Sequence, residues 1–151
     1  MWRLAAHTIM SLEQNKSLVR RFADRINARD LDGALALIGP AYVEHAARPG
    51  MPQGVDAVRA WFTLLWASFP DTQATIHDMI AEGDKVVIRM SAEGTHQGPF
   101  MGMPPTGKRL ITTFIDIHRI VDGKIVEHWN ETDTLGMLQQ LGLVPPPRYS
   151  T

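Results

Sequence analysis

The stretch IDIHRIVDGKIVEHWNETD, residues 115–133, decides the fold of this chain. Two runs rich in isoleucine, valine and tryptophan flank Asp122-Gly123, and this pattern predicts a β-hairpin that turns at the Asp-Gly dipeptide. The stretch also carries five acidic side chains and two histidines. The register of the hairpin therefore determines which of these polar groups lie beside a pocket and which face solvent.

Two turn geometries fit the Asp-Gly dipeptide. A two-residue type I′ loop would pair Val121 with Lys124, whereas a type I turn followed by a glycine bulge would pair Ile120 with Lys124. The difference exchanges the faces of one strand relative to the other. We favour the bulged loop because it gathers a compact polar set on one face. That face would contain Phe114, Asp116, His118, Val126, His128 and Asn130.

The other register would place Asp116 with Glu127 and Trp129 instead. In either case a hairpin at the edge of a small sheet commonly has one solvated face, which is the simpler interpretation. Apolar residues occur on both faces of this ribbon, however, so we expect both faces to be at least partly covered. The hairpin is thus a candidate wall of a pocket.

The first half of the chain predicts helices. Ser11 and Gln14 have capping-box spacing ahead of an amphipathic helix, and residues 30–39 predict a short second helix. Residues 40–54 are rich in proline and glycine and predict a loop. Apolar residues at helical spacing then predict a third helix over residues 54–69.

The second half predicts strands, because β-branched residues alternate with polar ones between turn signals. The expected strands cover 72–81, 85–96, 109–120 and 124–133, with a long loop at 97–108 and a last helix at 134–142. Helices followed by antiparallel strands indicate an α+β domain. We expect a cone-shaped α+β barrel, in which three N-terminal helices pack on a strongly curved, mainly antiparallel sheet that encloses a cavity.

The composition is typical of a soluble globular protein with one domain. The chain has 151 residues, a net charge of -1 and no cysteine, which leaves no general attraction to nucleic acid or membrane and no thiolate chemistry. No run approaches the roughly 18 apolar residues of a membrane span. We expect a cytoplasmic protein with an N-terminal extension at 1–10, one domain at 11–143 and a tail at 144–151.

Three motifs follow one another in the second half: GTHQGPFMGMPPTGK (94–108), HRIVDGKIVEHW (118–129) and DTLGMLQQLG (133–142). Together they resemble the SnoaL-like polyketide (ester) cyclases of the nuclear transport factor 2-like superfamily, and the resemblance runs from about Ser11 to Leu143. It implies a homodimer that packs through the outer face of the sheet. It also implies acid/base chemistry, without metal or cofactor, that closes a ring in a hydrophobic polyketide ester by an intramolecular aldol reaction.

The resemblance also points to two positions of the hairpin. In the antibiotic-pathway cyclases the chemistry is attributed to a histidine in one strand and an aspartate in the last strand. Matching through the shared RIVDGKI places the histidine position on Asp116 and the aspartate position on Asn130. A carboxyl in an apolar cavity can have its pKa raised toward neutrality and transfer a proton, and an asparagine amide can donate to an enolate oxygen.

Our hypothesis for the site assigns proton transfer to Asp116, assistance to His128 and a hydrogen bond to the substrate oxygen to Asn130. The residues expected to contact a hydrophobic substrate are Arg89, His118, Phe114, Trp61, Phe22 and Met101. The simpler interpretations are a core role for the aromatic and methionine residues, and surface roles for Arg89 and for His118 near the turn. The six histidines have no close helical spacing, so the sequence predicts no metal site.

Two other functions fit the same residues. A hydrolase could activate water with Asp116 and Arg89, as part of the Asp-Arg-Asp set of limonene epoxide hydrolase, a superfamily relative whose second aspartate position again falls on Asn130. A carrier of hydrophobic small molecules would need no titratable group in its cavity. Exposed Asp116 and His128 side chains would favour the carrier.

Overall fold

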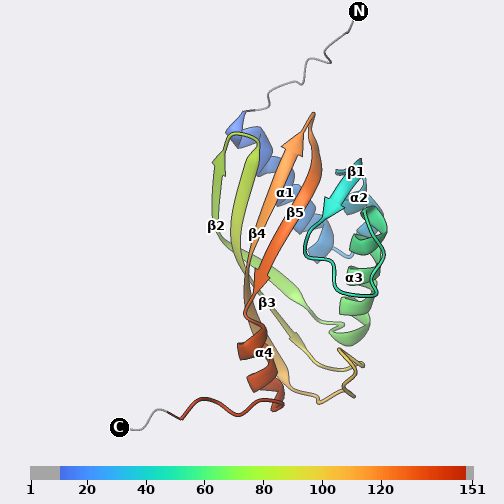
Figure 1. Ribbon diagram of the computed structural model, residues 1–151, viewed down its shortest axis with the longest axis vertical. Coiled ribbons are helices and arrows are strands. Elements are labelled where there is room, and N and C mark those ends of the chain that lie inside the picture. Colours follow the sequence, from blue (N-terminus) through green and yellow to red (C-terminus); the bar gives the residue numbers. More distant parts are fainter. Residues whose placement is uncertain (1–10, 149–151) are drawn as a thin grey trace, which may run out of the picture.

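The computed structural model describes residues 11–148 and shows helices packed on one face of a curved sheet (Figure 1). In chain order the elements are α1 (Leu12–Asn27), α2 (Leu31–Leu35), β1 (Ile38–Glu44), α3 (Val55–Ser68), β2 (Gln73–Glu82), β3 (Lys85–Thr95), β4 (Arg109–Val121), β5 (Lys124–Thr132) and α4 (Thr134–Leu141). The predicted α+β architecture is confirmed. The expected extension at 1–10 and the end of the tail at 149–151 lie outside the described residues.

Five strands in the described part of the chain form an open sheet in the order β1-β5-β4-β3-β2. The β2, β3, β4 and β5 strands pair antiparallel with their neighbours, whereas β1 runs parallel to β5. The sheet curls strongly around α1 and α3 but does not close, so the expected barrel is an incomplete cone (Figure 1). No helix within residues 11–148 is long and apolar enough to cross a membrane.

The α1 helix forms as its local signals predict. The Ser11 side chain accepts a hydrogen bond from the Gln14 backbone N–H, and the Gln14 side chain accepts one from the Ser11 backbone N–H. This capping box satisfies two backbone donors that no helical carbonyl can reach. The apolar face of α1, with Leu18 and Val19, is then buried against the sheet.

The β1 strand corrects the sequence analysis. Residues 38–44 were expected to end a helix and begin a loop, but α2 already ends at Leu35 and the chain continues as an edge strand. Proline at position 40 is tolerated because an edge strand leaves one row of backbone groups unpaired. The partner of β1 is β5, with Glu44 opposite His128. A pairing between such distant segments leaves no local pattern to detect.

The hairpin turn also differs from the favoured prediction. Val121 lies opposite Lys124, and both residues between them have positive φ angles, 49° at Asp122 and 72° at Gly123. These angles are those of a two-residue type I′ turn. The three-residue loop that we expected is therefore wrong.

A β-bulge one step beyond the turn nevertheless gives the polar face that we expected. The pairing changes between Ile120 opposite Ile125 and Arg119 opposite Glu127, which makes Val126 the extra residue on β5. The bulge shifts the register by one residue, so that Asp116 lies opposite Asn130 and His118 lies opposite His128. Ile125 moves into the cavity wall, and Val126 does not share the polar face as predicted.

Replacing Gly123 with alanine should lower the free energy of unfolding by about 1–2 kcal/mol, because a Cβ atom is unfavourable at a left-handed backbone conformation. Asparagine tolerates this conformation, so Gly123→Asn should retain most of the stability. Urea denaturation of the two variants beside the parent protein measures the difference. Equal losses in both variants would contradict a turn-specific cause.

Candidate active site

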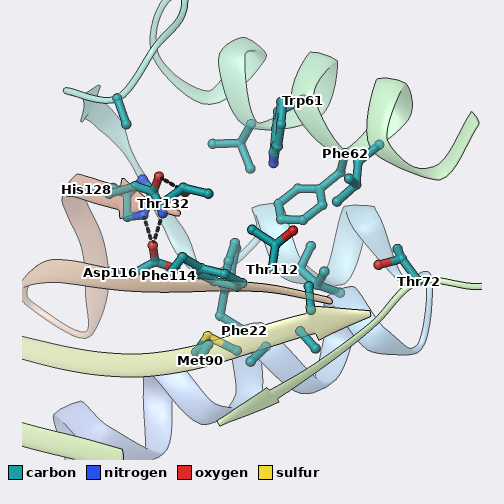
Figure 2. Close-up of a pocket in the computed structure, with 18 of the residues that line it drawn as sticks. Phe22, Trp61, Phe62, Thr72, Met90, Thr112, Phe114, Asp116, His128 and Thr132 are labelled. Carbon is teal, nitrogen blue, oxygen red and sulfur yellow. Dashed lines mark hydrogen bonds and ion pairs between the residues drawn. The ribbon is translucent and has the colours of Figure 1, made fainter. Parts of the chain in front are cut away.

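A cavity of about 260 Å³ lies between the helices and the concave face of the sheet. Most of its wall is apolar, and aromatic side chains from α1, α3 and β4 contribute to it. Trp61 and Phe62 extend from α3 toward the sheet, while Phe22, Met90 and Phe114 lie on the opposite side (Figure 2). The cavity is thus suited to a compound that is largely hydrophobic.

A polar network occupies one end of this cavity, where β4, β5 and β1 lie side by side. His128 Nε2 lies 3.3 Å from Asp116 Oδ1, and His128 Nδ1 lies 2.9 Å from both carboxylate oxygens of Glu44. The Tyr42 hydroxyl donates a hydrogen bond of 2.6 Å to Glu44 Oε2, and the Ala46 backbone N–H donates to Glu44 Oε1. One imidazole is therefore held between two carboxylates, as the dashed lines at Asp116 in Figure 2 show in part.

Asn130 forms a further hydrogen bond with the Asp116 carboxylate. The Asn130 Nδ2 atom donates a hydrogen bond of 2.6 Å to Asp116 Oδ1, and the Thr132 hydroxyl donates one of 2.7 Å to Asn130 Oδ1. The ionised Asp116 carboxylate can only accept hydrogen bonds, so the NH2 end of the amide faces Asp116 and the amide oxygen is left to accept from the Thr132 hydroxyl. Asn130 thus positions the carboxylate as well as lining the cavity.

His118 lies opposite His128 on the neighbouring strand β4 and packs against this network. The two imidazole rings are stacked, with centroids 4.9 Å apart and an interplanar angle of 20°. His118 is buried, and its Nδ1 atom has no hydrogen-bond partner within residues 11–148. The alternative that placed His118 in solvent near the turn is therefore wrong.

The charges of the network follow from these contacts. Burial alone would lower the pKa of His128, but the hydrogen bonds and negative charges of Asp116 and Glu44 outweigh it and raise the pKa to about 9. Burial would likewise raise the pKa of Asp116 and of Glu44, yet the His128 cation and the hydrogen bonds hold both below their usual values. At neutral pH the network is carboxylate, imidazolium, carboxylate. The expectation of an Asp116 pKa raised toward neutrality is therefore wrong, because it omitted this cation.

Burial is the largest effect on the pKa values of His118 and Tyr42, the two neighbours of the network. Burial and the adjacent His128 charge lower the pKa of His118 to about 4, so this imidazole is neutral at physiological pH. Burial and the Glu44 charge raise the pKa of Tyr42, which stays a neutral hydrogen-bond donor. In this network the His128 cation is therefore in contact with two anions, Asp116 and Glu44.

Comparison with known proteins identifies the family. The family model described as SnoaL-like polyketide cyclase matches residues 16–141. The chain belongs to the SnoaL-like polyketide cyclase family. The resemblance seen in the three sequence motifs is thereby confirmed.

Relatives of this SnoaL-like chain agree with the assignment. The aklanonic acid methyl ester cyclase DnrD of Streptomyces peucetius is 34% identical over 129 residues, which cover 83% of this chain and 88% of DnrD. The nogalonic acid methyl ester cyclase of Streptomyces nogalater is 34% identical over 107 residues, or 70% of this chain and 76% of that protein. The structure of AclR from Streptomyces galilaeus, a candidate hydroxylase, superposes with a TM-score of 0.81 at 32% identity, covering 91% and 87% of the two chains.

The sequence analysis of this SnoaL-like chain missed Tyr42 and Glu44. Both lie on β1, in the segment predicted to be a loop. The only available signal was the alternation in AYVE, where tyrosine and glutamate are two residues apart and so share a strand face. That signal is too short to predict a strand among prolines and glycines.

Two residues expected to contact substrate lie elsewhere. Arg89 is on the outer face of the sheet, where its guanidinium pairs with Asp78 at 2.6 Å, because its neighbours Ile88 and Met90 take the inner face. Met101 lies in the loop after β3 and is 49% exposed, outside the cavity wall. Both expectations are wrong for this cavity. Phe22, Trp61, Phe114 and His118 do line it, and their contact with substrate stays a prediction.

The strands also create a cluster that histidine spacing could not reveal. Ligand atoms of Asp116, His118 and His128 lie within 4.8 Å of one another. A metal ion needs a neutral imidazole, however, and His128 carries a proton between two carboxylates. A cation would have to displace that proton, so this group suits proton transfer better than metal binding.

Proposed function

We propose that this chain closes a ring in a hydrophobic, polyketide-derived carbonyl compound by an intramolecular aldol reaction. One observation carries the proposal: an ionised carboxylate, Asp116, stands at the polar end of an apolar cavity, held by an imidazolium and an amide. Such a carboxylate can take a proton from a carbon next to a carbonyl group. The family relatives named as cyclases support the same reaction class.

In the proposed reaction Asp116 acts first as base and then as acid. Its carboxylate takes a proton from the carbon beside one carbonyl, and the resulting enolate carbon attacks a second carbonyl carbon of the same molecule. A carbon–carbon bond forms, the second carbonyl oxygen becomes an alkoxide, and Asp116 returns the proton to that oxygen. The product is an isomer of the substrate, so no cofactor and no water is consumed.

The neighbours of Asp116 have separate roles in this scheme. The His128 imidazolium keeps Asp116 ionised before the reaction, and Glu44 keeps His128 protonated from its other side. Asn130 orients Asp116 with one amide N–H, and we assign its second N–H to the developing enolate oxygen. Glu44 is thus a positioning residue for His128, whereas Asp116 and Asn130 contact the substrate.

The two other functions have less support. A hydrolase using Asp116 and Arg89 would need both residues at one site, and Arg89 lies on the opposite face of the sheet in contact with Asp78. A carrier would be favoured by solvent-exposed Asp116 and His128, but their side chains are only 13% and 17% exposed. A buried charged network in the cavity is costly to form without a chemical role.

We further propose a homodimer that packs through the outer face of the sheet. Ile80 on β2 and Ile111 and Ile115 on β4 are 66%, 54% and 45% exposed. Their strand positions alternate with the buried inner residues, so all three lie on the outer face. An exposed apolar face of this kind is typical of a surface that another protein covers.

The reaction can be tested with aklanonic acid methyl ester, the compound in the name of the Streptomyces peucetius relative. A cyclase should convert it to a ring-closed product of unchanged mass, which mass spectrometry and the absorption spectrum report. Release of methanol together with the free acid, which is lighter than the ester by one CH2 group, would indicate an ester hydrolase instead. Stoichiometric binding with recovery of unchanged ester would indicate a carrier.

A further inference from the structure

Two threonines line the cavity away from the Asp116 network. Thr112 lies on β4, and Thr72 lies in the connection between α3 and β2. Figure 2 shows Asp116 on one side of the cavity, Thr72 on the other side, and Thr112 between them. Thr112 and Asp116 are four positions apart on one strand, so about 13 Å separates them at about 3.3 Å per residue. The cavity therefore has a second polar region, far from the proposed base.

The hydroxyl groups of both threonines are available to a ligand. Within residues 11–148 neither Oγ1 atom has a hydrogen-bond partner, and neither atom is fully enclosed by protein. The Thr72 residue as a whole is only 8% exposed, and its oxygen is directed toward the interior of the cavity (Figure 2). Because buried polar groups in proteins are normally hydrogen-bonded, a hydroxyl in this position is suited to binding an oxygen of the ligand.

Backbone contacts hold Thr72 in place. Its N–H donates a hydrogen bond of 3.1 Å to the Phe69 carbonyl, and its carbonyl accepts one of 3.0 Å from the Arg29 guanidinium. Glycine at position 94 allows the close approach of this segment, since a Cβ atom there would lie 3.1 Å from Thr72 Cα and Cβ. The hydroxyl is therefore positioned before a ligand arrives, which lowers the entropic cost of binding.

Small residues of the sheet leave room beside the two hydroxyls. Ala74 on β2 and Ala92 and Gly94 on β3 line this part of the cavity, and Ala92 lies directly opposite Thr112. A flat ring can therefore lie against the sheet with one edge toward the threonines. A hydroxyl group both donates and accepts hydrogen bonds, so it can bind either a carbonyl or a hydroxyl group on that edge.

We propose that Thr72 and Thr112 form a subsite that binds an uncharged oxygen substituent, a carbonyl or a hydroxyl group, on the ring of the ligand that is remote from the reacting carbonyl groups. The subsite selects elongated fused-ring compounds that are polar at both ends. The identity of the ligand as a polyketide-derived substrate rests on the proposed function. The recognition of the oxygen is a property of the cavity and can be measured without turnover.

The test compares two uncharged probes of similar shape, 2-(hydroxymethyl)anthraquinone and 2-ethylanthraquinone, which differ by a hydroxyl in place of a methyl group. Neither has a ketone side chain, so neither can undergo the proposed ring closure. Quenching of tryptophan fluorescence reports their binding, because Trp61 and Trp66 line the cavity. The ratio of the two dissociation constants is the measured quantity, since it cancels effects that are common to both probes.

The double variant Thr72→Val/Thr112→Val should shift this ratio about tenfold in favour of the ethyl compound. Valine has nearly the shape of threonine but leaves the hydroxyl of the probe without a partner. The double variant Thr72→Ser/Thr112→Ser keeps both hydroxyls and should keep the wild-type ratio. A matched control, Thr75→Val/Thr113→Val, makes the same change at exposed positions of β2 and β4 and should also leave the ratio unchanged.

Three outcomes are informative. An unchanged ratio in the double valine variant would show that the hydroxyl of the probe binds elsewhere, and it would overturn the proposal. An equal change in affinity for both probes would overturn it too, because the threonines would then only fill space. A shifted ratio in a protein that closes no ring would support the subsite and refute only the proposed reaction.

Discussion

Asp116→Asn will lower kcat for ring closure by about 10²–10⁴-fold, the range that a positioned acid/base group contributes. An amide has the shape of the carboxylate but cannot take a proton from carbon. The substitution also keeps an oxygen that can accept the hydrogen bond from Asn130 Nδ2. The loss should therefore appear in kcat, with a smaller change in KM, because the apolar wall that binds the substrate is untouched.

A matched control uses an aspartate on the other face of the same sheet. Asp78 pairs with Arg89 on the outer face and is 59% exposed, so Asp78→Asn should retain full activity. Circular dichroism and thermal unfolding of both variants would show whether the fold is intact. Wild-type turnover by folded Asp116→Asn would remove Asp116 from the mechanism.

The free energy of unfolding should pass through a maximum near pH 6.5. In the folded protein the pKa of His118 is lowered to about 4, so between pH 4 and 6.5 the unfolded chain binds more protons and stability rises with pH. The pKa of His128 is raised to about 9, so between pH 6.5 and 9 the folded protein binds more protons and stability falls with pH. Each limb should amount to about 3 kcal/mol, since one pKa unit corresponds to about 1.4 kcal/mol.

Two variants test which residues cause the rise of stability below pH 6.5 and the fall above it. His118→Gln should remove the rise below pH 6.5, and Glu44→Gln should shorten the fall above it, because His128 then keeps only one carboxylate partner. The lowered pKa values of Asp116 and Glu44 add a further loss of stability only as pH falls below about 4.5. Urea denaturation across pH 4.5 to 9 measures the profile. A flat profile in the parent protein, or an unchanged alkaline limb in Glu44→Gln, would contradict these charge assignments.

Local sequence signals predicted the elements whose causes are local. The Ser11–Gln14 capping box began α1 where expected, and the Asp-Gly dipeptide placed the β-hairpin correctly. The three motifs identified the family, and the polar face of the hairpin was predicted with Asp116, His118, His128 and Asn130 together. These features depend on neighbouring residues and on the period of two along a strand, which a sequence displays directly.

The predicted pairing of the two hairpin strands was correct beyond the turn, but the predicted structural cause of that pairing was wrong. We placed the bulge in the turn, whereas the turn has two residues and the bulge is at Val126. Both arrangements insert one extra residue and so produce the same faces beyond it. The alternation of residue types along two strands shows which residues share a face. It does not show where in the hairpin an extra residue forms the bulge.

Only the tertiary structure decided how the site is charged and what it can bind. The β1 strand joins the sheet through a parallel pairing with β5 and brings Glu44 to His128, which turns a pair into a carboxylate–imidazolium–carboxylate network. The same packing leaves Arg89 outside and places Arg48 over Trp61 in the cavity. The sequence by itself determined α1, α3, the presence of the hairpin and the family, because those follow from neighbouring residues. The pKa of a buried group depends on charges a few ångströms away in space, and these come from segments far apart in the chain.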